Sequence, residues 1–173
     1  RDLTVTGVQT CALPISSGST LMGNTEKKLT EAMEALDEGR YQNSFEIFKP
    51  LAEHGDPKAQ FYLGFLYRIG QAIKQNYQQA YHWYLLSAKQ GYAEAQYKVG
   101  LMNYKGQVVD QDYQKAFKWY SLAAEQGDRK AQFNLGVLYR RAQGITQDHG
   151  KALAWFLAAG ERSEEHTSEL QSQ

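Results

Sequence analysis

Two stretches of the sequence decide the fold: YQQAYHWYLLSAKQGYAEAQYKVG, from Tyr77 to Gly100, and YQKAFKWYSLAAEQGDRKAQFNLG, from Tyr113 to Gly136. They are related by an offset of 36 residues without a gap. A weaker copy, YQNSFEIFKPLAEHGDPKAQFYLG, begins at Tyr41 in the same register. The offset also brings small and aromatic residues into alignment: Ala80, Ala116 and Ala152; Trp83, Trp119 and Trp155; Gly55, Gly91 and Gly127; Gly64, Gly100 and Gly136. A fixed period of this length indicates a repeat protein.

Each repeat predicts two helices. The first, AQFYLGFLY, places apolar residues at i, i+4, i+7 and i+8, and the second, YQKAFKWYSLAAEQG, carries a similar stripe. Residues that suit the ends of these helices lie at the expected places. Asp56 suits an N-cap and Pro57 the first helical position, whereas Gly127 suits a left-handed residue after the last turn. The second helices are preceded by Asn76, Asp112 and Asp148.

The stretch TEKKLTEAMEALDEG, residues 25–39, adds a leading helix, so the sequence predicts eight helices in four antiparallel pairs. Two short helices cannot bury their apolar faces alone, and neighbouring pairs must therefore stack. Gly64, Gly100 and Gly136 lie inside the first helices, where a Gly costs about 1 kcal/mol relative to Ala. Its recurrence predicts a close approach by another helix. The predicted fold is all-α, a right-handed superhelical solenoid of antiparallel helix pairs.

At these residues the chain resembles the Sel1-like repeat family, which is related to the tetratricopeptide repeat. The matching residues are Ala116, Trp119, Tyr120, Ala123, Ala124, Gly127, Ala131, Gln132, Leu135, Gly136, Leu138 and Tyr139. The resemblance covers residues 80–159 well and residues 44–76 less well. The departures lie in the loops, so we expect loop geometry to differ between repeats. Ala142 replaces one loop glycine, and Ala72 and Val108 replace another. The Cys pairs of some secreted relatives are absent, which gives no support to a penicillin-binding or hydrolase role.

The two ends of the chain do not resemble the repeats. Reading the reverse complement of one DNA sequence that encodes Val5–Ser16 gives the protein sequence of Arg162–Ser172. We therefore expect residues 1–16 and 162–173 to derive from a sequencing adapter, as in a metagenomic fragment. Such segments are excluded from fold reasoning, which leaves the repeat solenoid in residues 17–161.

Composition narrows the function classes. The formal net charge is zero, so no basic field indicates nucleic acid. No apolar run reaches the ~20 residues that span a bilayer. His54, His82 and His149 lie at unrelated repeat positions without metal-ligand spacing, and no nucleophile elbow, phosphate loop or dinucleotide motif occurs. We therefore expect neither catalysis nor a metal nor a cofactor.

Positions whose residue differs from repeat to repeat are not required for stacking, and they are candidates for binding. On the first helices they form one face, at i, i+4, i+7 and i+11. In solenoids of the related families the first helices line the concave side, which predicts a recognition surface for a protein or peptide, with a plain solvated face as the alternative. The candidate residues are Lys58, Tyr62, Phe65, Lys98, Leu101, Asn134 and Arg141.

The sequence thus favours a monomeric scaffold or adaptor that binds another protein. Two other hypotheses stay open: the regulatory segment of a larger enzyme, and an assembly factor of the bacterial cell envelope. The cytoplasm and the bacterial periplasm are both compatible with these residues. The Tyr62, Lys98 and Arg141 side chains are expected to be dispensable for stability, because their positions lie off the stacking stripe.

Overall fold

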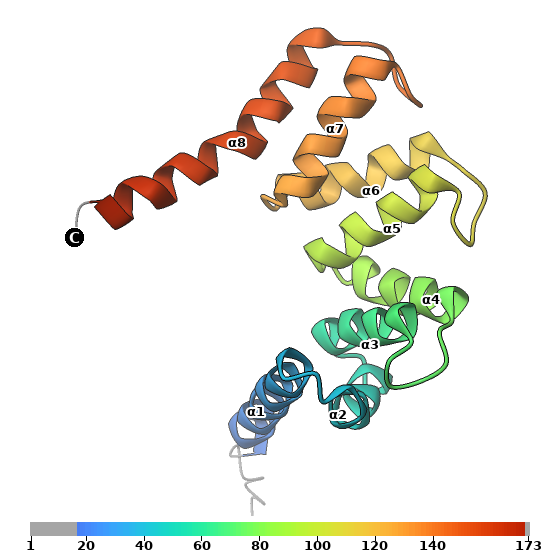
Figure 1. Ribbon diagram of the computed structural model, residues 1–173, viewed down its shortest axis with the longest axis vertical. Coiled ribbons are helices and arrows are strands. Elements are labelled where there is room, and N and C mark those ends of the chain that lie inside the picture. Colours follow the sequence, from blue (N-terminus) through green and yellow to red (C-terminus); the bar gives the residue numbers. More distant parts are fainter. Residues whose placement is uncertain (1–16, 172–173) are drawn as a thin grey trace, which may run out of the picture.

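The computed structural model describes the backbone of residues 17–171 and, within it, the side chains of residues 23–160 (Figure 1). This part of the chain forms eight α-helices and no strand, which confirms the all-α repeat solenoid. The helices are α1 (Ser17–Asp37), α2 (Tyr41–Glu53), α3 (Pro57–Ile69), α4 (Tyr77–Lys89), α5 (Ala93–Lys105), α6 (Tyr113–Glu125), α7 (Arg129–Arg141) and α8 (His149–Gln171).

The leading helix begins earlier than the sequence indicated, at Ser17 rather than near Thr25. Residues 1–16 and 172–173, and the side chains from residue 161 onward, lie outside the described residues. The adapter origin of the two ends therefore stays a prediction. The backbone of α8 runs without a break across the expected boundary at residue 161.

The helices stack in chain order into an arc (Figure 1). Substantial contacts join only consecutive helices, and the closest pairs are α3 with α4, α5 with α6, and α7 with α8. The loops that close these pairs are longer than the turns that join one pair to the next. Each pair therefore corresponds to one copy of the repeat, as the 36-residue offset predicts.

The predicted helix ends are confirmed. The Asp56 carboxylate accepts a hydrogen bond from the Ala59 backbone N–H at 2.7 Å, and Pro57 is the first residue of α3. Asn76, Asp112 and Asp148 accept equivalent bonds at the starts of α4, α6 and α8. The bond from the Lys115 N–H is the main cause that lowers the pKa of Asp112. After the second helices, Gly91 and Gly127 have φ of 92° and 88°, the left-handed region that favours Gly.

The interior glycines are sites of close helix contact, as predicted. A Cβ at Gly64 would lie 2.9 Å from the Tyr84 ring, and one at Gly100 would lie 2.7 Å from the Tyr120 ring. At Gly136 the ring of Phe156 would be 2.6 Å away. The first helix of each pair thus needs Gly where the aromatic residue of the second helix crosses it.

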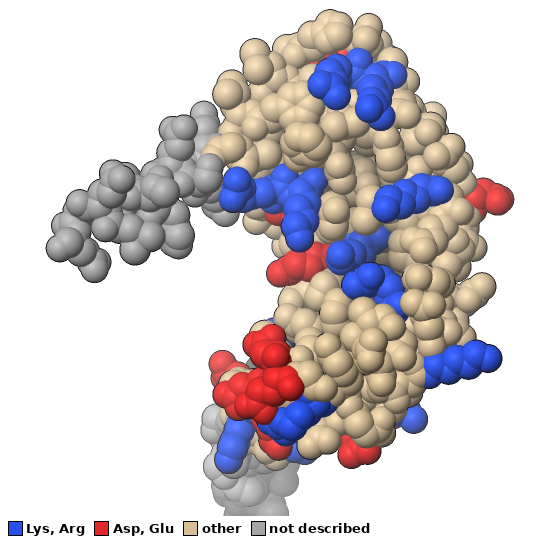
Figure 2. All heavy atoms as spheres, in the orientation of Figure 1, with Lys and Arg blue, Asp and Glu red and all other residues tan. Residues whose placement is uncertain are grey.

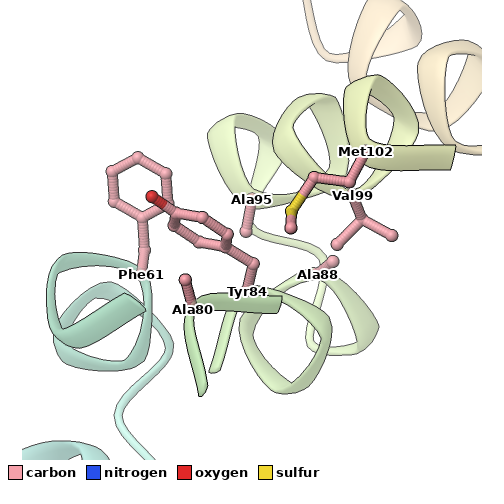
Figure 3. Packing of buried hydrophobic residues seen from close by; sticks show 7 residues of the cluster. All are labelled: Phe61, Ala80, Tyr84, Ala88, Ala95, Val99 and Met102. Atoms are coloured by element: carbon pink, nitrogen blue, oxygen red, sulfur yellow. The ribbon is translucent and has the colours of Figure 1, made fainter. Parts of the chain in front are cut away.

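The core continues from one repeat into the next. Tyr84 of α4 lies between Phe61 of α3 and the small residues Ala95 and Val99 of α5 (Figure 3). Trp119, from the following repeat, packs against the same cluster and is only partly buried. Tyr84 and Tyr120 are fully buried, so they fill the interior while the Trp residues close its edge.

A recurring Gln links the repeats through hydrogen bonds. Gln60, Gln96 and Gln132 each donate from Nε2 to a carbonyl of the preceding helix, at 3.2–3.3 Å. Gln90 and Gln126 then donate to the Oε1 atoms of Gln60 and Gln96, both at 2.8 Å. The buried Oε1 of Gln132 has no partner among the described residues.

Within the described structure, the Oε1 atom of Gln96 accepts a hydrogen bond and that of Gln132 does not, which allows a prediction about stability. Gln96→Leu replaces the amide with an apolar group and removes both side-chain bonds, the one to the Ala88 carbonyl and the one from Gln126. The Ala88 carbonyl keeps the bond from the Gly91 N–H, so the loss is that of two hydrogen bonds. We expect a loss of about 1–3 kcal/mol in the free energy of unfolding, measured by urea denaturation. Gln132→Leu is the matched control and should cost less, because its Oε1 contributes no bond. Equal losses would show that the bond between Gln126 and Gln96 adds no stability.

The loops correct one expectation. Ala142 has φ of 54° at the end of α7, close to the 72° and 67° of Gly70 and Gly106 at the ends of α3 and α5. Val108 has φ of 75°, close to the 73° of Gly144 in the last repeat. Backbone geometry is therefore kept at these two positions, and the non-Gly residues carry strain there. Ala72, the equivalent of Val108 and Gly144, does not have a positive φ, so the loop after α3 differs at that position as expected.

Candidate functional site

The inner side of the arc contains a groove of about 550 Å³. Side chains from alternate helices line it, which brings α1, α3, α5 and the start of α7 to one surface. The lining residues are Leu36, Phe61, Tyr62, Phe65, Ala93, Glu94, Tyr97, Lys98 and 126–130. A second hollow of about 480 Å³ continues along α7 and shares Tyr97, Arg129 and Lys130 with the groove. The first helices therefore line one shared groove, and binding of a partner there stays a prediction.

Three aromatic residues at one repeat position run along the groove and the hollow. Phe61 is 9% exposed, Tyr97 is half-buried and Phe133 is 54% exposed. Each ring contacts the aromatic residue of the second helix in its own pair. Phe61 also contacts the rings of Tyr62 and Tyr92, whereas Phe133 contacts only that of Phe156 among the described residues. Sequence analysis missed this row, since it took recurrence as a sign of stacking duty alone. The signal that was available is the aromatic character of the position in all three repeats.

The structure corrects the role of Tyr62. Its ring stacks on the fully buried ring of Phe48 at 5.0 Å between centroids, with 12° between the planes. It also packs against the two hydrophobic clusters on either side of α3. Burial is the main cause that raises the pKa of Tyr62. The expectation that Tyr62 lies off the stacking stripe is wrong, and its removal would affect the fold as well as the groove.

Lys98 is a cation on the inner side of the arc. Its Nζ lies 5.5 Å from the centroid of the Tyr97 ring. Burial lowers the pKa of Lys98, and the positive charges of Arg68 and Lys130 lower it further. Among the described residues, no Asp or Glu forms an ion pair with Lys98, Arg68 or Lys130. These cations therefore lack an ion pair, although the nearby Asp128 carboxylate acts to raise the pKa of Lys98.

The seven predicted residues are only partly brought together. Tyr62, Phe65 and Lys98 line the groove, and Asn134 lines the second hollow. Leu101 is half-buried and packs against the cluster of the next repeat. Lys58 and Arg141 line neither the groove nor the hollow.

Charge is unevenly distributed along the arc. Figure 2 shows Lys and Arg side chains gathered on the middle of its inner side and a group of Asp and Glu side chains near α1. Exposed acidic residues in the last turns of α1 and just beyond it are Glu34, Asp37 and Glu38. The groove thus has a basic floor and an acidic end.

The described part of the chain has neither a metal site nor a membrane-spanning helix. No group of three or more His, Cys, Asp or Glu residues there has the arrangement of a metal site. The His54 ring lies against the Pro50 carbonyl at 2.6 Å, and His82 and His149 are exposed. None of the described helices has the length and apolar character that crossing a bilayer requires.

Comparisons with known proteins identify the repeat. The Sel1 repeat matches residues 57–92, 93–128 and 129–163. Among solved structures, a Sel1 repeat protein from Oxalobacter formigenes is 31% identical with a TM-score of 0.74, and the match covers 78% of this chain and 53% of that one. The protein c5321, described as a protective antigen of uropathogenic Escherichia coli strains with an SLR fold, is 40% identical with a TM-score of 0.66.

The match to c5321 covers 68% of this chain and 25% of that protein. The chain thus spans about half of the first relative's length and a quarter of the second's. A Sel1 repeat protein from Klebsiella pneumoniae, at 17% identity and a TM-score of 0.54, shares the fold. Among curated proteins, none matches the chain. With three consecutive repeats over most of its described helices, the chain belongs to the Sel1 repeat family, whose members generally serve as scaffolds for protein interactions.

Proposed function

We propose that the chain is a non-catalytic scaffold that binds a segment of a partner protein along the groove on the inner side of the arc. The observation that carries the proposal is the exposed ring of Phe133, which continues the aromatic row of the groove. Large aromatic side chains supply much of the energy of protein interfaces when a partner buries them. A monomeric solenoid presents such a row as one continuous surface.

The charges of the groove favour an acidic partner segment. Lys98, Arg129 and Lys130 line it, and these three cations outnumber the two acidic lining residues, Glu94 and Asp128. A segment that carries carboxylates would be attracted to this surface, and added salt would weaken the attraction. The acidic end near α1 would disfavour a uniformly acidic ligand there, so the arc also sets the direction of the segment.

The test uses peptides rather than an unknown natural partner. Peptides are selected from a displayed random library on the wild-type protein, and their affinity is measured by fluorescence anisotropy. We expect the selected peptides to combine acidic and aromatic residues. The double variant Lys130→Ala, Phe133→Ala should bind them at least about tenfold more weakly, because one buried hot spot contributes about 2 kcal/mol or more.

The control is a matched pair of exposed residues on a second helix. Lys118 and Leu122 lie on α6 and line neither the groove nor the hollow. Lys118→Ala, Leu122→Ala should leave affinity unchanged, and both double variants should keep the helical circular dichroism of the wild type. Peptides that bind the groove variant normally and lose affinity in the α6 variant would place binding outside the groove and overturn the proposal.

A further inference from the structure

A smaller cavity, distinct from the groove and the hollow along α7, lies between α3, α4 and α5. Its volume is about 130 Å³. It is lined by Arg68, Tyr77, Tyr84, Lys98, Leu101, Met102, Lys105 and Gln107. Lys98 also lines the groove, so the two spaces are adjacent. The cavity has room for a group of a few heavy atoms rather than for a large side chain.

Two polar groups of this cavity lack a hydrogen-bond partner. Tyr84 is 0% exposed, and its hydroxyl has no partner in the described structure. The Nε atom of Arg68 is likewise buried and without a partner. Buried polar groups in native proteins are nearly always bonded, since leaving one unsatisfied costs its full desolvation penalty. The Arg68 Nε–H can only donate, whereas the Tyr84 hydroxyl can donate or accept. The Arg68 side chain lies close enough to lower the pKa of Tyr84, yet neither the Nε atom nor the hydroxyl has a hydrogen-bond partner in the described structure. An acceptor beside them would satisfy both groups.

The charge around the cavity also favours an anion. Arg68, Lys98 and Lys105 carry positive charge, and no Asp or Glu is among the described residues that line the space. Burial and the neighbouring cations lower the pKa of Lys98. Burial raises the pKa of Tyr84 to about 12, which keeps its hydroxyl protonated and able to donate. A bound anion would offset the repulsion among these cations.

The next repeat shows that this arrangement is specific to one place in the solenoid. Tyr120 is the equivalent of Tyr84, and its buried hydroxyl also lacks a partner. The equivalents of Arg68, Lys98 and Lys105 there are Tyr104, Asn134 and Arg141, so only one of the three cations recurs. Phe48 and Phe156 occupy the same position in the outer repeats, so the repeat accepts a ring without a hydroxyl.

We propose that this cavity binds a single oxyanion, with the Arg68 Nε–H and the Tyr84 O–H as hydrogen-bond donors and Lys98 and Lys105 as the compensating charges. The shared ligand chemistry is a compact group with acceptor oxygens and negative charge. It is supplied by a carboxylate or by a phosphate. If the proposed function holds, an acidic side chain of the segment in the groove reaches the cavity past Lys98, and this last step alone rests on that function.

The test measures binding of free ions and needs no partner protein. Inorganic phosphate and acetate are titrated separately into the full chain at constant ionic strength, and amide chemical shifts are followed by NMR. We expect saturable shifts at the end of α3 and along α4 and α5 for at least one of the two ions, and the tighter ion identifies the source. Arg68→Gln and Tyr84→Phe should each weaken binding about tenfold or more, because a hydrogen bond to a charged group contributes at least that much.

Tyr120→Phe is the matched control. It removes an equivalent buried hydroxyl next to a site without the Arg, and it should bind the ion like the wild type. Tyr84→Phe should keep the wild-type melting temperature without ions, since Phe occupies this position in two other repeats. Absence of saturable shifts in the wild type, or wild-type affinity in Tyr84→Phe and Arg68→Gln, would overturn the proposal.

The outcome is separable from that of the peptide test. The groove variant Lys130→Ala, Phe133→Ala leaves the donors of the cavity in place and should bind the ion normally. Ion binding without peptide binding would support the cavity and contradict the scaffold groove. Peptide binding without ion binding would support the scaffold groove and contradict the anion site in the cavity.

Discussion

Gly100→Leu is expected to destabilise the solenoid by about 3 kcal/mol, the upper part of the range for overpacking. A Cβ at this position would lie 2.7 Å from Cδ1 of the Tyr120 ring and 3.3 Å from Cβ of Trp119. The ring of Tyr120 is fully buried between helices. The gain in helix propensity on replacing Gly is only about 1 kcal/mol and is outweighed. Chemical denaturation of the purified variant measures the loss.

Gly160→Leu is the control for this prediction. Gly160 lies in α8, and no atom lies within 4 Å of a Cβ built on it. The same substitution should there be neutral or stabilising by up to about 1 kcal/mol through helix propensity. A Gly100→Leu protein as stable as the wild type would mean that Gly100 is tolerated rather than required by the crossing of α5 and α6.

Phe48→Ala is expected to lower the free energy of unfolding by about 3–5 kcal/mol, as deletion of a buried aromatic ring does. Phe48 is 0% exposed, belongs to the cluster that joins α1, α2 and α3, and supports the stacked ring of Tyr62. The cavity left behind would lie directly under the groove. Urea denaturation followed by circular dichroism measures the effect.

The same chemical change at Phe133 separates packing from binding. Phe133 contacts the ring of Phe156 at 5.3 Å between centroids but remains mostly exposed. Phe133→Ala should cost about 1 kcal/mol, the order of a single aromatic pair. If Phe48→Ala were no more destabilising than Phe133→Ala, the first helix pairs would not share the continuous core described above.

The helices and their ends were predictable because their signals are local. An Asp one residue before a helix needs only the first turn to satisfy its bond, and Asp56, Asp112 and Asp148 do so in the structure. The interior glycines were predictable for a different reason. A costly residue kept at one repeat position must be compensated by packing, and the contacts of Gly64, Gly100 and Gly136 supply that compensation.

The groove was predicted as a face but not residue by residue. Comparing equivalent positions of the repeats distinguishes core positions from binding positions only when each position has a single role. Two positions of the groove have both roles. Tyr62 varies and yet packs on Phe48, whereas the row that contains Phe133 recurs and yet becomes exposed at α7. How far a ring of this row is covered depends on the place of its repeat in the solenoid. The sequence of one repeat does not determine that place.

The prediction of loop geometry was wrong at two positions, for a physical reason. A Gly in a loop indicates that the backbone there can adopt a φ near 70°. A Val or Ala at the same position gives no such indication. Val108 has φ of 75°, which a β-branched residue rarely adopts. The sequence pattern predicts a change of geometry at each replaced glycine, but the left-handed backbone is kept at Val108 and Ala142 and lost only at Ala72.

The series of contacts along the arc has a mechanical consequence. Because substantial contacts join only consecutive helices, a force applied at the two ends of the arc passes through every helix junction in turn. The compliances of springs in series add, so a small rotation at each junction produces a large change in the width of the mouth between α1 and α7. A partner can therefore widen or narrow the arc without breaking the core of any one repeat, and the stiffness of the whole is set by its softest junction.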